Sequence, residues 1–68
     1  MLRVKIETDN AAFAGDGEQE VARLLRIVAE RVADGQLDGV IRDINGNRCG
    51  EFDLRLERVQ GEDANAEG

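Results

Sequence analysis

The stretch RDINGNRCG holds the densest set of side chains that could bind a metal ion or perform chemistry. Asp43, Asn45 and Asn47 have the one-three-five spacing with which a calcium-binding loop begins. Such a loop needs glycine at its sixth position and a bidentate glutamate at its twelfth, where this chain has Arg48 and Leu54. The stretch is therefore not expected to bind calcium.

The dipeptide Asn45-Gly46 instead indicates a tight hairpin turn, because both residues tolerate the positive φ angles that such turns require. A two-residue type I′ turn would place Asp43 opposite Arg48 across the hairpin. A type I turn with a glycine bulge would pair Asp43 with Asn47 instead. Both alternatives make the stretch a connection between two antiparallel strands.

Cys49 is the only cysteine, and a nucleophilic thiol needs a neighbouring base. The chain contains no histidine, so we expect Cys49 to be a small, partly buried strand residue. One cysteine cannot form an intramolecular disulfide, and without histidine a zinc cluster has no material. We expect no catalytic residue, no cofactor and no metal site, and the chain is predicted not to be an enzyme.

Fifteen acidic residues against nine basic ones give the chain a net charge of −6. This charge makes direct nucleic-acid binding unfavourable, since that needs clustered positive charge. The negative charge favours a partner protein with a basic surface. Electrostatic steering would bring the chain to this partner, and direct binding would then block the partner's surface. The acidic residues predicted to bind this partner are Asp9, Asp16, Glu18, Glu20, Asp34 and Asp38. The alternative is that the acids in the loop and the first helical turn only stabilise the helix start and keep the chain soluble.

Hydrophobic periodicity predicts the elements that position these side chains. Residues 2–7 and 51–58 alternate apolar and charged residues, which is typical of half-buried strands. Residues 40–44 are expected to form the remaining strand, joined to the third by the hairpin turn. Residues 18–34 form an amphipathic helix. Its apolar stripe consists of Val21, Leu24, Leu25, Val28 and Val32. The large apolar residues expected to complete the core are Leu2, Val4, Ile6, Phe13, Ile41, Ile44, Phe52, Leu54 and Leu56.

Several residues define the ends and margins of the predicted helix. Asp16 is the expected N-cap, with Gln19 three residues later in capping-box spacing. Gly35 ends the helix as a C′ residue. Ile27 falls among charged residues, so it is a candidate exposed apolar contact. Phe13 is expected to fold back from the preceding loop and close the edge of the core.

The order strand, helix, strand, strand predicts an α+β domain over residues 1–59. If the helix makes the first two strands parallel, the third lies between them and antiparallel to both, which gives the order 1-3-2 with the helix on one face. The other face would stay open and carry alternating charges, which makes a homodimer possible. Residues 60–68 are acidic and lack large apolar residues, so we expect a disordered tail.

Three features predict a soluble, cytoplasmic protein. A lone cysteine is typical of a reducing compartment. The N-terminus does not resemble a signal peptide. No apolar run approaches the ~20 residues that a membrane span needs.

Three segments together resemble short, uncharacterised proteins of phages, prophages and other mobile elements of proteobacteria. The segments are IETDNAAF (Ile6–Phe13), EVARLLRIVAERVADG (Glu20–Gly35) and RDINGNRCG (Arg42–Gly50), and the likeness covers most of residues 4–52. Small acidic phage proteins without enzymatic apparatus are often inhibitors of host defence, including anti-CRISPR proteins. The resemblance thus implies a host protein as the partner, and it implies no catalytic residues.

Two alternatives to this inhibitor remain open. The chain could be a homodimeric structural module that pairs through its open sheet face or an edge strand and has no host target. It could also be a minor nucleic-acid-binding accessory protein, with a surface formed by Arg42, Arg48, Arg55 and Arg58.

Overall fold

The structure, a computed structural model, describes residues 1–57. The predicted acidic tail and Arg58 lie outside these residues. The elements in chain order are β1 (Leu2–Ile6), the 3-10 helix η1 (Ala11–Phe13), α1 (Gly17–Ala33), β2 (Asp38–Arg42) and β3 (Arg48–Leu54).

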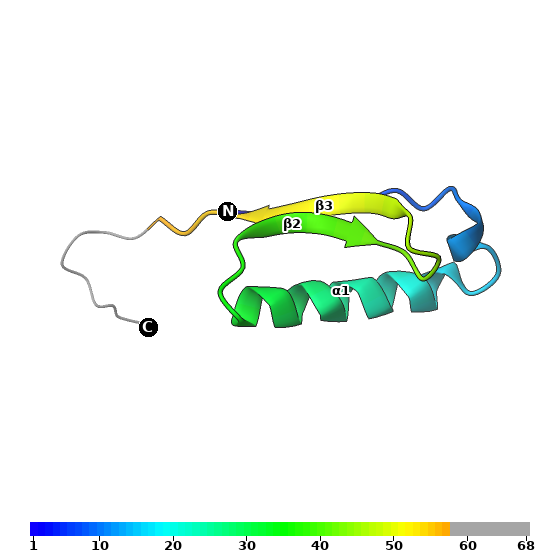
Figure 1. The fold of residues 1–68 in the computed structure, drawn as a ribbon, viewed down its shortest axis with the longest axis horizontal. Helices are drawn as coiled ribbons and strands as arrows, with labels where there is room; N and C mark the ends of the chain where they lie inside the picture. The colour runs from blue at the N-terminus through cyan, green and yellow to red at the C-terminus, as the bar shows by residue number, and fades with distance from the viewer. Residues whose placement is uncertain (58–68) are drawn as a thin grey trace.

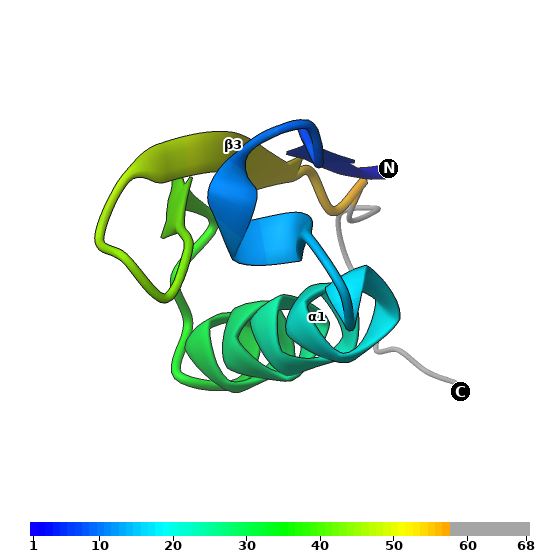
Figure 2. The same cartoon turned by 90° about the vertical axis from the view of Figure 1, so that its right-hand side faces the viewer.

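The three strands form one sheet in the order β1-β3-β2, and β3 is antiparallel to both neighbours. Helix α1 runs along one face of this sheet (Figure 1). Seen from the end, η1 lies between the sheet and the start of α1 (Figure 2). The predicted β-α-β-β arrangement and the 1-3-2 strand order are confirmed.

The buried core is smaller than the apolar content of the sequence predicts. Among the described residues its apolar members are Phe13, Leu24, Val28, Ile41, Cys49 and Phe52. Phe13 closes the core from η1, as expected, and Cys49 is a buried strand residue. Four residues assigned to the core are instead largely exposed: Leu2 at 51%, Leu25 at 45%, Ile44 at 68% and Leu56 at 52%.

Helix α1 ends in the predicted way but begins differently. Gly35 has φ +93°, and the N–H groups of Gly35 and Gln36 donate to the carbonyls of Val32 and Arg31, which is a Schellman motif. Asp16 is the N-cap residue, but its side chain makes no capping hydrogen bond. Its ψ of 52° is far from the extended conformation of a capping residue, so the predicted capping box with Gln19 is wrong.

The hairpin uses the bulged turn, the second of the two predicted alternatives. Asp43 N–H donates to Asn47 O and Gly46 N–H donates to Asp43 O, both at 2.9 Å, and Gly46 has φ +83°. The turn takes up Ile44, so β2 ends at Arg42 instead of Ile44. The strand β3 correspondingly begins at Arg48 instead of Glu51 and ends at Leu54, which leaves Leu56 beyond the strand.

The sheet face opposite α1 carries alternating charges, as predicted. Strand register places Arg3 beside Asp53, which lies beside Asp38. One step along the strands, Lys5 lies beside Glu51. Residues that pair across neighbouring strands point to the same face of a sheet. This face is therefore mostly charged, with Val40 beside Glu51 as an exposed apolar member, and no described element covers it.

Candidate protein-binding surface

The sheet has two edge strands, β1 and β2, and each of them lies beside a different side of α1. Arg31 of α1 donates to Val40 O, and Glu20 accepts the N–H of Ile44 just after β2. The side of α1 that carries Glu20 and Arg31 therefore faces β2. Successive helix residues are rotated by about 100°. Ile27 therefore shares the β2 side. We call this side the β2 flank.

The opposite side of α1 faces β1. Three residues lie about 100–140° around the helix axis from Glu20, on the far side of the buried Leu24 and Val28 and away from β2. These residues are Val21, Leu25 and Val32. Together with the apolar side chains of β1 (Leu2, Val4 and Ile6) they define the β1 flank.

On the β2 flank, side chains occupy the outward carbonyls of the edge strand. Leu54 N–H donates to Leu37 O, so the backbone N–H and C=O groups of residues 37, 39 and 41 point to β3. The N–H and C=O groups of residues 38 and 40 therefore point outward. Gln36 Nε2 donates to Asp38 O at 2.9 Å, and Arg31 Nη1 donates to Val40 O at 2.8 Å.

Gly39 makes this arrangement possible. A Cβ at Gly39 would overlap the guanidinium of Arg31, so only glycine lets Arg31 cross the strand to its outer edge. The guanidinium also lies 5.0 Å from the centroid of the Phe52 ring, a cation–π contact. Hydrophobic periodicity does not predict this contact, although a glycine inside a strand is a known signal of a close approach.

The hairpin is tied to α1 on the same flank through Glu20. Arg23 donates Nε and Nη2 to the two Glu20 carboxylate oxygens at 2.9 and 2.8 Å, and Ile44 N–H donates to Glu20 Oε2 at 2.9 Å. The hydrogen bonds from Arg23 lower the pKa of Glu20 below its ordinary value, with burial opposing and Ile44 N–H adding to the effect. The same pairing raises the pKa of Arg23.

Asp43 organises the turn from inside. It is 5% exposed, and its Oδ1 accepts the N–H groups of Asn45 and Asn47 at 2.9 and 3.0 Å, while Oδ2 has no hydrogen-bond partner. Burial, followed by the negative charges of Asp43 and Glu20, raises the pKa of the Cys49 thiol. The Asp43 carboxylate thus binds the backbone of its own turn. The raised pKa of Cys49 favours the neutral thiol.

The β1 flank has no comparable polar cover. Val4, Ile6, Val21 and Val32 are only partly buried, although they pack against the core. Leu2 and Leu25 are about half exposed. Apolar side chains of α1 and β1 therefore face solvent along this side. Ile27, Leu37 and Ile44 on the β2 side are exposed as well, so the two flanks differ in their strand edges and not in apolar exposure.

The backbone edge of β1 is also free. Met1 and Arg55 exchange backbone hydrogen bonds, and Glu7 N–H donates to Cys49 O at 2.7 Å, so the odd-numbered residues point to β3. The N–H and C=O groups of Leu2, Val4 and Ile6 therefore point outward. Within residues 1–57, no side chain bonds to any of these six groups. The β1 flank is thus an open strand edge beside exposed apolar side chains.

The six acidic residues predicted to bind a partner do not form one surface. Asp9, Asp16 and Glu18 are exposed near the start of α1, and Asp34 and Asp38 are exposed near its other end. The 17 residues of α1 separate these two groups by about 25 Å. Glu20 is 8% exposed and faces the hairpin instead of solvent.

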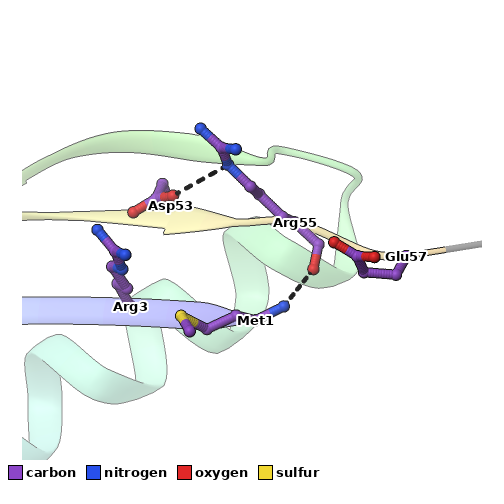
Figure 3. Close-up of a pocket in the computed structure, with 5 residues that line it drawn as sticks. All are labelled: Met1, Arg3, Asp53, Arg55 and Glu57. Carbon is purple, nitrogen blue, oxygen red and sulfur yellow. Dashed lines mark hydrogen bonds and ion pairs between the residues drawn. The ribbon is translucent and has the colours of Figure 1, made fainter.

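Two of the arginines considered for nucleic-acid binding form ion pairs with acidic residues of β3. Arg48 pairs with Glu51 at 2.7 Å, and Arg55 lies 4.0 Å from Asp53. Figure 3 shows the second pair beside Arg3, in a pocket where the amino group of Met1 donates to Arg55 O. Arg42 donates to Gly46 O at 3.3 Å.

The part of the chain that the structure describes contains no group of three or more acidic, cysteine or histidine side chains arranged to hold a metal ion. In the same part, α1 is too short and too polar to cross a membrane. Comparison of the chain with protein-family models, curated proteins and solved structures found no match.

Proposed function

We propose that this chain is a non-enzymatic interaction protein that binds a partner protein through its β1 flank. The observation that carries the proposal is the combination of a free strand edge with half-exposed Leu2 and Leu25. Unpaired strand edges invite pairing with another chain, and exposed apolar side chains beside such an edge add burial to the backbone hydrogen bonds.

The context implied by the sequence resemblance makes the partner a host protein. Binding would then act by steric occlusion, as an inhibitor of a host defence or nucleic-acid-binding complex does. The exposed acids Asp9, Asp16 and Glu18 lie at one end of the molecule and would steer the chain toward basic patches outside the contact itself. This part of the proposal is supported by the charge of the chain and by the resemblance.

Affinity capture with matched variants tests the proposal. Leu25→Glu places a charge on the β1 flank, and Ile27→Glu places the same charge on the β2 flank, at positions 45% and 38% exposed on one helix. We expect a host protein retained by the wild-type chain to be retained by Ile27→Glu and lost by Leu25→Glu. Equal retention by all three chains, or no retained protein, would contradict the proposal.

A further inference from the structure

The inference concerns the kind of polypeptide that the β1 flank accepts, and it rests on the proposed function. Strand β1 presents two different faces to any neighbour. Leu2 and Val4 point to the side of α1, and Arg3 and Lys5 point to the open face of the sheet. These residues line a surface depression together with Glu51 and Asp53.

The neighbour that β1 already has is complementary on both faces. In β3, Leu54 and Phe52 lie opposite Leu2 and Val4. On the open face, Asp53 and Glu51 lie opposite Arg3 and Lys5. Cross-strand pairs of opposite charge or of apolar residues stabilise a sheet, so β3 has the residue pattern that β1 selects.

The charges of β1 are nevertheless largely uncommitted. Asp53 and Glu51 form their ion pairs with Arg55 and Arg48, not with β1. Within residues 1–57, Arg3 forms no ion pair, and Lys5 has one exposed pair with Glu7 at 3.9 Å. A second strand beside β1 would find both cations available on its open face.

We propose that β1 accepts a fourth strand from a partner protein, an extended segment in which acidic residues alternate with apolar ones. Its acidic side chains would pair with Arg3 and Lys5 on the open face. Its apolar side chains would cover Leu2 and Leu25 on the side of α1. Its backbone would bond to the outward N–H and C=O groups of Leu2, Val4 and Ile6.

A second copy of the chain fits this edge less well. In a two-fold antiparallel pairing of two β1 strands centred on Val4, Arg3 of one copy would face Lys5 of the other. Like charges directly opposite each other destabilise a sheet. Charge complementarity therefore favours a different, acidic strand over self-pairing.

Peptide titration followed by amide NMR tests the inference on the full chain. The probes are a blocked peptide that alternates valine with glutamate and its counterpart that alternates valine with lysine. We expect the glutamate peptide to bind about tenfold more tightly, because two cross-strand ion pairs replace two like-charge contacts. Its binding should weaken with salt and should slow the amide exchange of Leu2, Val4 and Ile6.

Variants locate the binding site of the peptide and separate the contribution of the Arg3 and Lys5 charges from that of the β1 backbone edge. Val4→Pro removes an outward N–H of β1, and Val40→Pro removes an outward N–H of β2. The glutamate peptide should lose binding to the first variant and keep it with the second. The double variant Arg3→Gln with Lys5→Gln keeps the edge, so it should bind both peptides with similar affinity even if Val4→Pro does not fold.

Three outcomes would overturn the inference: equal affinity of the wild-type chain for both peptides, protection that maps away from β1, or a dimer in solution that Val4→Pro abolishes. The failure of this inference is distinct from failure of the proposed function. Capture that depends on Leu25, together with equal peptide affinities, would retain the binding surface and reject the acidic strand.

Discussion

The two flanks of this small domain expose their strand edges to different degrees. On the β2 flank, Arg31 and Gln36 bind the outward carbonyls, and Glu20 fastens the hairpin to α1. On the β1 flank, no residue of the described part of the chain covers the outer edge of the strand, and Leu2 and Leu25 are half exposed. The chain's own polar side chains thus bind the strand edge on the β2 flank, and no described side chain does so on the β1 flank.

The two flanks differ in how far the chain itself protects its strand edges. Side chains that hold the β2 flank are long and polar, and they reach around Gly39 to the backbone. They protect an edge strand against unwanted pairing, as many natural sheets require. Among the described residues, the β1 flank has no such protection, so its strand edge is accessible.

The largest effect should come from truncating the apolar core beside β2. Ile41→Ala removes a side chain that is 2% exposed and should lower the free energy of unfolding by about 2–5 kcal/mol. Leu2→Ala on the other flank should cost less than about 1 kcal/mol, because Leu2 is already half exposed. Urea denaturation of both variants measures the contrast, and equal costs would contradict it.

Gly50→Ala should have the next largest effect, and on the β1 side. A Cβ at Gly50 would overlap the carbonyl oxygen of Lys5, which is backbone and cannot rotate away. We expect a loss of about 3 kcal/mol, with β1 displaced from β3. Thermal unfolding gives the loss, and amide exchange shows whether β1 opens first. Unchanged protection of β1 would mean that the strain is absorbed elsewhere.

Gly39→Ala should be milder, because its new methyl group meets the end of a flexible side chain. The displaced Arg31 would lose its bond to Val40 O, at a cost of about 1 kcal/mol. A double-mutant cycle with Arg31→Ala checks the mechanism. If Gly39→Ala acts by displacing Arg31, it should cost much less in the Arg31→Ala background, and additive costs would disprove that route.

The smallest effect should be the pH-dependent contribution of Glu20. Its pKa is lowered in the folded chain, so its stabilisation is complete above the unfolded carboxyl value of ~4.3 and is lost as the pH falls through the folded pKa. Glu20→Gln should therefore be less stable than wild type near neutrality, and the gap should close in acid. Glu30→Gln, an exposed helical acid, is the control and should show no such convergence.

Periodicity was sufficient to predict β1, β3 and α1, because β1 and β3 alternate and the helix stripe repeats at helical spacing. The strand order followed from the helical connection between the first two strands. It could not separate Leu25 from Leu24, since both lie on the apolar stripe and only packing decides that one is buried. It also extended β2 to Ile44, because an apolar residue in a short turn resembles the end of a strand. The acidic residues were identified by charge, but Glu20 needed three dimensions to show its contact with Ile44 N–H.

The crossing of Arg31 over Gly39 also has a consequence for stoichiometry. A sheet with two accessible edges can add copies or partners at both ends and grow into a linear polymer. The outward carbonyls of β2 are already occupied by Arg31 and Gln36 of the chain itself. If β1 accepts a strand as proposed, addition would therefore stop after one partner, and the complex would stay limited in size.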